Sequence, residues 1–204
     1  MRTGTWVMPE TPRQPVSEES LESVLTEVAA LHVERLGAIA RVLDVHGVRL
    51  GLEVIGVESF RKGEGIPFVP RLADFDQRLG ALWDEAPNLG ILIDAFHLYA
   101  AGETVEAGLP WGVGRVVWVH VADLPKGAAA DRRLMHDNDR GLPGEHAAVD
   151  CRGMLERLER AGYAGPVTAE PMPGCRSLAG LNPEATANHV AAALHSVWPR
   201  KRKA

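Results

Sequence analysis

The chain has 204 residues, of which 46 % are hydrophobic and 24 % charged, and its formal net charge at pH 7 is -5. This composition is typical of a globular protein with a substantial core, and the acidic balance argues against non-specific binding to nucleic acid or to an anionic membrane. No apolar run approaches the roughly 20 residues that a membrane-spanning helix needs. The only two cysteines, Cys151 and Cys175, predict no disulfide framework and favour a reducing cytoplasm.

Short apolar strands alternate with amphipathic helices along the chain. The first predicted strand covers residues 5–8, and a long helix follows at 17–46, with apolar residues at a 3.6-residue spacing. A strand at 48–55, a Gly/Pro-rich loop at 56–70 and a helix at 72–86 come next. Further strands are predicted at 89–93 and 116–121, with a weaker helical segment between them that starts near Gly102.

The C-terminal part continues the same alternation. A polar loop at 124–146 leads into a helix around Met154, a strand at 166–169 and a final helix that begins at Asn182-Pro183. The strands are almost continuously apolar, which is typical of strands that are covered on both faces of a parallel sheet. We therefore expect a parallel α/β domain of about five β-α units over residues 1–198, followed by a disordered basic tail at 199–204.

The end of each strand after the first carries a residue that can bind a metal. Glu53, Asp94, His120 and Glu170 each follow a short run of uncharged, mainly apolar strand residues. In a parallel α/β fold the C-terminal ends of the strands meet at one edge, so these side chains are expected to converge. Three carboxylates and one imidazole favour Mn²⁺, Mg²⁺ or Co²⁺, although zinc also accepts such ligands. The sequence thus predicts one divalent-metal site.

Several other residues lie close to these positions in the sequence. His97 is three residues beyond Asp94, where it could reach the pocket from the following loop, and Arg140 lies in a Gly/Pro-shaped loop suited to directing a cation at a ligand oxygen. Asp123 either caps the turn after its strand or orients His120. Trp111 and Trp118 are expected to be packing residues rather than platforms for a substrate. No Gly-x-Gly-x-x-Gly follows the first strand, so a dinucleotide-binding fold has no chemical support.

The ordered set of motifs resembles the xylose-isomerase-like superfamily of sugar isomerases and epimerases, which are TIM barrels. The matching stretches are Gly-Leu-Glu at Glu53, Ile-Asp-Ala-Phe-His-Leu from Ile93, Val-His-Val-Ala-Asp from Val119, Arg-Gly-Leu-Pro-Gly-Glu from Arg140, and Ala-Gly-Tyr-Ala-Gly-Pro-Val-Thr-Ala-Glu ending at Glu170. The resemblance implies a (β/α)8-type barrel, of which the chain holds the part from strand 4 to strand 8. The chain departs from the family pattern at Pro-Gly-Glu-His, where His146 stands in place of a small residue.

The resemblance also implies roles for the site residues. Glu53, Asp94, His120 and Glu170 would bind one divalent metal, and the two glutamates would form the acid/base pair. Proton transfer through an enediolate stabilised by the metal would then isomerise or epimerise a small sugar or a related hydroxyketone. His97 and Arg140 would hold the oxygens of this sugar or polyol-derived substrate.

Other interpretations remain open at this stage. By the resemblance the first three β-α units are absent, so the start site is mis-assigned, the chain is truncated, or a partner in a homo-oligomer supplies strands. The same site would also suit a dehydratase of a cyclic polyol ketone. A catalytically inactive barrel fragment is a further alternative. An abasic-site endonuclease shares the barrel, but here Gly141 follows Arg140 where such a nuclease would offer another histidine.

Overall fold

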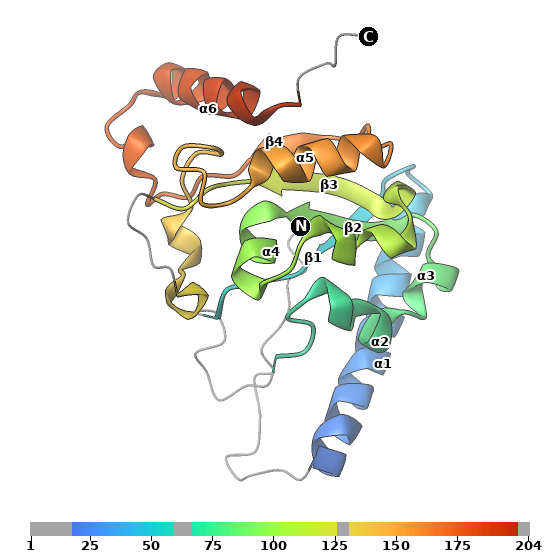
Figure 1. Ribbon diagram of the computed structural model, residues 1–204. Coiled ribbons are helices and arrows are strands. Elements are labelled where there is room, and N and C mark those ends of the chain that lie inside the picture. Colours follow the sequence, from blue (N-terminus) through green and yellow to red (C-terminus); the bar gives the residue numbers. More distant parts are fainter. Residues whose placement is uncertain (1–17, 59–66, 126–130, 200–204) are drawn as a thin grey trace.

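A four-stranded parallel sheet forms the centre of the protein (Figure 1). The computed structural model describes residues 18–58, 67–125 and 131–199. Within these ranges the strands are β1 (Leu50–Glu53), β2 (Leu89–Asp94), β3 (Val116–Val121) and β4 (Val167–Ala169), paired in that order. The predicted parallel α/β architecture is confirmed. The predicted strand at 5–8 and residues 200–204 of the predicted tail lie outside the described residues.

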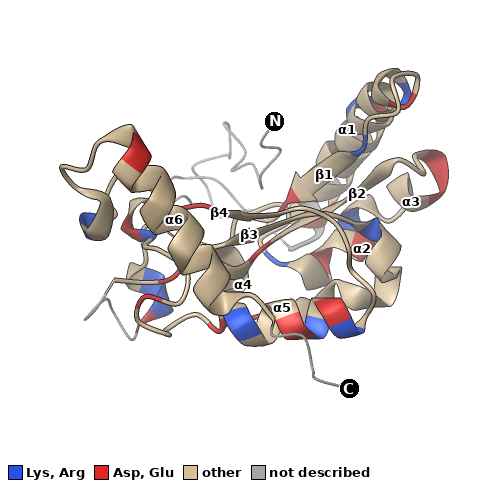
Figure 2. Ribbon diagram, turned by 90° about the horizontal axis from the view of Figure 1, so that it is seen from above, with Lys and Arg blue, Asp and Glu red and all other residues tan. Residues whose placement is uncertain are grey.

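Helices pack around the sheet at both of its edges (Figures 1 and 2). The long helix α1 lies on the β1 side and contacts the shorter helices α2 and α3, whereas α6 lies on the β4 side and contacts α5. Figure 2 shows acidic and basic residues alternating along α5. The α-helices are α1 (Glu18–Asp44), α2 (Phe75–Leu79), α3 (Leu82–Glu85), α4 (Ala95–Ala101), α5 (Cys151–Arg160) and α6 (Pro183–Val197).

Short 3-10 helices occupy many of the connections between these elements. They are η2 (Leu72–Asp74), η3 (Val105–Ala107), η4 (Leu109–Trp111), η5 (Val113–Arg115), η6 (Arg132–Leu134), η7 (Asp137–Asp139) and η8 (Arg176–Leu178). None of the helices in the described ranges is long and apolar enough to cross a membrane.

The core lies between the sheet and the helices that follow its strands. Ile91, Ile93 and Val119 of the two central strands are fully buried. Because apolar side chains point to both faces of these strands, each face is covered by protein, as expected for crossover connections between parallel strands. Trp111 packs against Phe75 with ring centroids 5.6 Å apart, so its predicted packing role is confirmed.

The segment around Gly102 differs from the sequence prediction. The helix in this region is α4, which begins directly after β2 and ends at Gly102, instead of starting there. Asp94 accepts hydrogen bonds from the N–H groups of Phe96 and His97, which caps the first turn. Gly102 has a φ of 74°, a left-handed conformation that glycine adopts easily and that ends the helix. His97 therefore lies on a helix and not on a loop.

The predicted helix at 72–86 is also divided. It consists of η2, α2 and α3, with Gly80 between the last two. A Cβ at Gly80 would lie 2.5 Å from Asp76 O, so the backbone is tighter there than a side chain allows. The other boundaries agree closely with the sequence. Asn182 caps α6 by accepting from Ala185 N–H, and Pro183 occupies the first turn.

Candidate metal centre

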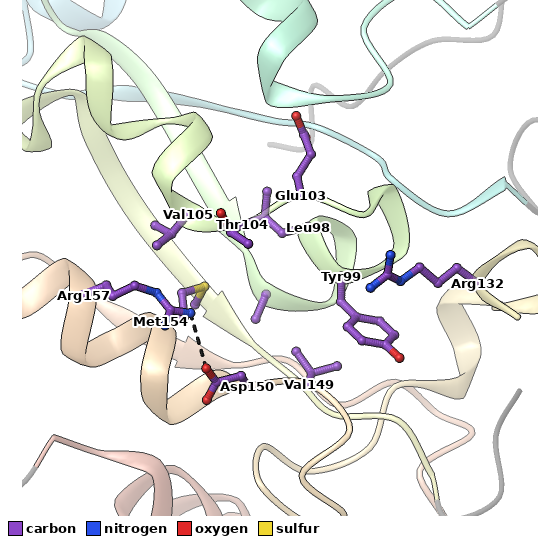
Figure 3. Close-up of a pocket in the computed structure, with 11 residues that line it drawn as sticks. Leu98, Tyr99, Glu103, Thr104, Val105, Arg132, Val149, Asp150, Met154 and Arg157 are labelled. Carbon is purple, nitrogen blue, oxygen red and sulfur yellow. Dashed lines mark hydrogen bonds and ion pairs between the residues drawn. The ribbon is translucent and has the colours of Figure 1, made fainter. Parts of the chain in front are cut away.

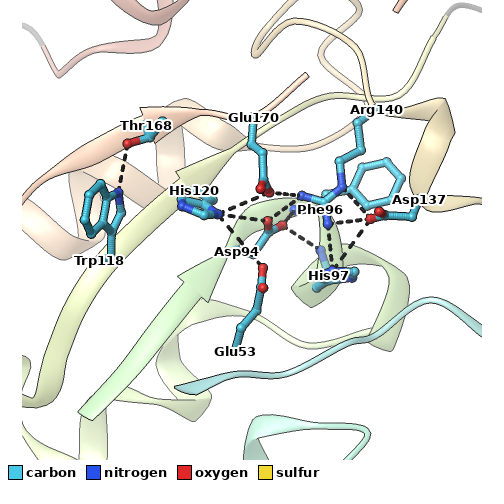
Figure 4. A network of polar contacts seen from close by, with 10 residues as sticks. All are labelled: Glu53, Asp94, Phe96, His97, Trp118, His120, Asp137, Arg140, Thr168 and Glu170. Atoms are coloured by element: carbon cyan, nitrogen blue, oxygen red, sulfur yellow. Dashed lines mark hydrogen bonds and ion pairs between the residues drawn. The ribbon is translucent and has the colours of Figure 1, made fainter. Parts of the chain in front are cut away.

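Four side chains that can bind a metal lie together at the C-terminal edge of the sheet (Figure 4). Glu53 ends β1, Asp94 ends β2, His120 lies near the end of β3, and Glu170 directly follows β4. The strand register places Asp94 opposite His120. The N–H of Glu170 donates to Val121 O at 3.0 Å, which continues the pairing past β4. The structure thus brings the four predicted ligands to one place.

The distances within this group suit a single cation. All four ligand atoms lie within 4.8 Å of one another. His120 Nδ1 is 3.1 Å from Glu170 Oε2, 3.8 Å from Asp94 Oδ2 and 4.0 Å from Glu53 Oε1. Donors that each lie about 2.0–2.2 Å from one ion are roughly 3–4.4 Å from one another. The three distances from His120 Nδ1 fall in this range, and the 4.8 Å limit on the whole group lies slightly above it.

The buried Oε1 oxygen of Glu53 gives an independent argument for a cation. The Glu53 side chain is 3 % exposed, and Oε1 has no hydrogen-bond partner within the described residues. A buried carboxylate oxygen without a donor is unfavourable unless a cation faces it. In Figure 4 the Glu53 carboxylate points toward Asp94 and His120. The residues present therefore fit a divalent ion held mainly by oxygen.

Arg140 enters the same group from the loop after β3. Its side chain is 1 % exposed, and Nη1 donates to Asp94 Oδ2 and to Glu170 Oε2, both at 2.6 Å. Nε donates to Asp137 Oδ1 at 2.7 Å, and the guanidinium carbon lies 5.0 Å from the centroid of the Phe96 ring. The guanidinium thus balances part of the negative charge that the carboxylates bring together.

His97 contacts this arginine from the first turn of α4. Arg140 Nη2 donates to His97 Nε2 at 2.7 Å, so the proton of the neutral ring is assigned to Nδ1. Burial lowers the pKa of His97 to about 4, which keeps the ring neutral. Nδ1 is buried and has no hydrogen-bond partner in the part of the chain that the structure describes. All three guanidinium nitrogens of Arg140 face protein acceptors, whereas His97 retains one N–H for another group.

The two glutamates of the centre have opposite pKa shifts. Burial raises the pKa of Glu53 to about 7, and the charges of Asp94 and Glu170 act in the same direction. Burial also opposes ionisation of Glu170, but its hydrogen bond with His120 and the charge of Arg140 outweigh it and lower its pKa. One carboxyl therefore titrates near neutral pH while the ionised form of the other is favoured, an arrangement suited to proton exchange.

The charges around the other two ligands favour their ionised forms. Burial opposes ionisation of Asp94, but the charge and hydrogen bond of Arg140 and the backbone N–H of His97 outweigh it and lower its pKa to about 2. The pKa of His120 is raised despite burial, because Glu170 and the other carboxylates of the centre stabilise the imidazolium. A cation bound at the centre would have to displace that proton.

Asp123 fixes the loop that carries Arg140. Its carboxylate is fully buried and accepts hydrogen bonds from the N–H groups of Leu124, His146, Ala148 and Val149 at 2.8–3.0 Å. Its backbone also pairs with Gly141, which follows Arg140. Of the two predicted roles, capping the turn is the one that the structure shows, and the capped segment extends through His146. Orientation of His120 is not among the described contacts of Asp123.

Asp137 is the member of the network that the sequence analysis missed. It lies three residues before Arg140 in η7, and its side chain is only 10 % exposed. The spacing Asp-x-x-Arg could have indicated a local ion pair, but such pairs are common on surfaces and do not by themselves indicate a site. Trp118, predicted to be a packing residue, is 42 % exposed, and its ring nitrogen donates to Thr168 Oγ1 at 2.8 Å.

Comparison with known proteins agrees with this geometry. A family model described as a xylose isomerase-like TIM barrel matches residues 3–196. Inosose isomerase from Halalkalibacterium halodurans is 26 % identical over 163 residues, which is 76 % of this chain and 50 % of that protein. The chain spans about half the length of the curated relatives that it matches.

Solved structures with the same fold cover most of the chain. A xylose isomerase domain protein from Alicyclobacillus acidocaldarius has a TM-score of 0.70 and 31 % identity, over 90 % of this chain and 61 % of that one. The IOLI protein, solved with a zinc atom, has a TM-score of 0.68 and 19 % identity, over 93 % of this chain and 60 % of that one. The expected barrel-type fold is confirmed, and the chain belongs to the xylose isomerase-like TIM-barrel family.

Proposed function

We propose that this protein is a divalent-metal-dependent isomerase or epimerase of a small sugar or a related hydroxyketone. One observation carries the proposal: three carboxylates and one imidazole from four adjacent parallel strands converge within 4.8 Å at the edge where such folds place their active sites. The similarity to inosose isomerase supports a reaction of this class.

The ion is assigned to Glu53, Asp94, His120 and Glu170. The oxygen-rich set favours Mn²⁺, Mg²⁺ or Co²⁺, and the zinc atom in the IOLI structure keeps Zn²⁺ among the candidates. When bound, a divalent ion stabilises the negative charge that develops on a substrate oxygen as the adjacent carbon loses its proton.

Glu53 and Glu170 are proposed as the acid/base pair. They come from β1 and from the end of β4, the outer two strands of the described sheet, so their carboxylates approach the centre from opposite sides. One carboxylate would remove a carbon-bound proton and the other would return a proton to the substrate. Return to the neighbouring carbon gives isomerisation, and return to the opposite face of the same carbon gives epimerisation.

His97 and Arg140 are proposed to act on the oxygens of the substrate in different ways. The N–H at Nδ1 of His97 is available to donate to a hydroxyl or carbonyl oxygen. Arg140 already donates to Asp94, Asp137, Glu170 and His97, so a direct contact with the substrate requires it to share one of these hydrogen bonds.

Metal binding is the first test. Mn²⁺ is titrated calorimetrically into the chelator-stripped chain, into Glu170→Gln, and into Glu159→Gln as a matched control on the exposed face of α5. We expect one ion per chain, weakened at least about tenfold in Glu170→Gln, which corresponds to about 1.4 kcal/mol, and unchanged in Glu159→Gln. Absence of binding by the folded wild-type chain would refute the proposed centre.

The reaction is then tested with candidate ketoses and cyclic polyol ketones in deuterated water. Deuterium incorporation into recovered substrate or product supports an isomerase or epimerase. Release of water without an isomeric product identifies the dehydratase alternative. Stoichiometric metal binding with neither reaction across the panel would favour a binding fragment without turnover.

A further inference from the structure

A further cavity lies on the outer side of α4, apart from the carboxylate centre (Figure 3). It is bounded by α4, the beginning of α5 and the segments around η3 and η6, and its volume is about 230 Å³. Leu98 and Tyr99 of α4 line it, whereas Asp94, which directly precedes the helix, belongs to the metal centre. Pockets for drug-sized ligands measure about 300–1,000 Å³, so this one suits a smaller molecule.

Most of the charged groups around the cavity already have partners. Arg157 Nη2 donates to Asp150 Oδ2 at 3.3 Å, and its Nε lies at ion-pair distance from Glu106 Oε1, 3.2 Å, without a hydrogen bond. The Glu103 carboxylate accepts from the N–H groups of Leu72 and Ala73 at 2.7 and 3.0 Å, and Figure 3 shows it pointing away from the two arginines. Together with Arg132, the lining holds two acidic and two basic side chains, Glu103, Asp150, Arg132 and Arg157.

Arg132 is the exception. Its guanidinium carbon lies 4.7 Å from the centroid of the Tyr99 ring, which holds the group against α4. No carboxylate pairs with Arg132 among the residues that the structure describes, although the neighbouring Arg133 pairs with Asp131 at 2.7 Å. In Figure 3 Arg132 and Arg157 reach the cavity from opposite sides. Arg132 is therefore a positioned cation that can form a planar, two-bond contact with one anion.

The floor of the cavity is hydrocarbon. Leu98, Val105, Val149 and Met154 line it, and each is 6 % exposed or less. These side chains are almost fully buried, so a hydrocarbon chain in the cavity would contact the limited apolar surface that they present there, which is favourable in proportion to its area. The cavity thus combines one available cation with an apolar surface.

We propose that this cavity binds a small aliphatic monocarboxylate, with its carboxylate on Arg132 and its hydrocarbon chain on the apolar floor. A single negative charge fits better than a phosphate dianion, because Asp150 and Glu103 line the same cavity and would repel a second charge. The proposal concerns a site separate from the metal centre and does not depend on the function proposed above.

The test uses the full chain and sodium hexanoate as the probe, with 1-hexanol and inorganic phosphate as comparisons. Binding is followed by the ¹³C-methyl NMR signal of Met154, which reports on the floor directly. We expect hexanoate to shift this signal saturably. Arg132→Gln should weaken the binding by at least about tenfold, because it removes a charged two-bond contact. The matched control Arg133→Gln removes the same charge one residue away, on a side chain that is 73 % exposed, and should change the affinity less than about twofold.

Each other outcome decides against the proposal. Equal binding of 1-hexanol would show that the charge contributes nothing, and tighter binding of phosphate would exclude a monocarboxylate site. Saturable binding that Arg132→Gln leaves unchanged would place the anion elsewhere. A Met154 signal unmoved by tens of millimolar hexanoate in the folded wild-type chain would refute the site itself. Thermal melting of both variants establishes that each remains folded.

Discussion

The Nη1 nitrogen of Arg140 lies 2.6 Å from Asp94 Oδ2, and both side chains are 1 % exposed. The same nitrogen lies 2.6 Å from Glu170 Oε2. Two of the proposed metal ligands therefore share a buried protein cation. Since carboxylate oxygens have more than one lone pair, they can accept from the arginine and still face an ion. We infer that Arg140 stabilises the centre in the metal-free protein by keeping closely spaced carboxylates compatible with burial.

Substitution of Arg140 should therefore destabilise the metal-free protein strongly. Arg140→Gln leaves Asp94 and Asp137 buried without their cation, and breaking a buried pair in this way costs about 3–5 kcal/mol. Urea unfolding in the presence of a chelator measures the loss. Arg133→Gln, which breaks an exposed pair with Asp131, should cost less than about 1 kcal/mol. Mn²⁺ should restore part of this loss. If the free energy of unfolding of Arg140→Gln is no higher with Mn²⁺ than with the chelator, the carboxylates do not form a cation site.

Glu53 should make the stability of the metal-free protein fall with rising pH. Its folded pKa of about 7 lies above the ordinary value of 4.5, mainly because of burial. The contribution of protonated Glu53 to the free energy of unfolding is fully present below about pH 4.5. It is lost as the pH rises through 7, and the total loss is roughly 3 kcal/mol. Glu53→Gln cannot ionise, so its free energy of unfolding should fall less between pH 4.5 and 8.

Chemical denaturation of both proteins at several pH values, with chelator present, gives this comparison. The informative quantity is the difference in free energy of unfolding between wild type and Glu53→Gln at each pH, because the other titrating groups are common to both proteins. Glu159→Gln, on the exposed face of α5, should parallel the wild type. If the free energy of unfolding of Glu53→Gln also runs parallel to that of the wild type over this pH range, the Glu53 carboxyl is ionised throughout. Its buried oxygen would then be neutralised by another group.

The sequence was most informative where a pattern needs only local spacing. Apolar runs identified the strands, and the ends of those runs identified Glu53, Asp94, His120 and Glu170, because parallel strands bring their C-terminal ends to one edge. The cap at Asn182 and the proline at the first helical position, Pro183, likewise act within one turn.

The remaining features depend on contacts between distant parts of the chain. Asp94 both ends a strand and caps α4, so the sequence after it was interpreted as a loop and the helix was placed too late. The contact between Arg140 and Asp94 joins residues 46 positions apart, and no periodicity predicts it. Asp137 was missed because its pairing with Arg140 becomes significant only once both side chains are known to be buried.

Asp123 should control the order of the loop at residues 141–149. Its carboxylate accepts from four backbone N–H groups, and Asp123→Asn would turn an NH₂ group toward at least one of these donors. An unsatisfied buried donor costs about 1–3 kcal/mol. We expect faster amide hydrogen exchange at Ala148 and Val149, with little change in β2.

Asp150→Asn is the matched control for this substitution. Asp150 caps α5 by accepting from Gly153 N–H at 2.9 Å, and asparagine caps helices about as well. The same change from carboxylate to amide should therefore leave exchange in the loop unaltered. Unchanged protection of Ala148 and Val149 in Asp123→Asn would show that the loop is held by other contacts.

Asp94 should combine two separable roles, one structural and one in ion binding. Oδ1 caps α4 through Phe96 and His97, while Oδ2 faces Arg140 and His120. Asp94→Asn keeps an oxygen for the cap but removes the charge, so α4 should remain protected from exchange while Mn²⁺ affinity falls at least about tenfold. Asp94→Ala loses the cap as well, which costs about a further 1 kcal/mol and should speed exchange at Phe96 and His97. Calorimetry measures the first effect and amide exchange the second. Wild-type Mn²⁺ affinity in a folded Asp94→Asn variant would show that Asp94 is not a ligand of the ion. Loss of affinity while α4 stays protected from exchange would establish that the carboxylate charge, and not the position of the helix, binds the ion.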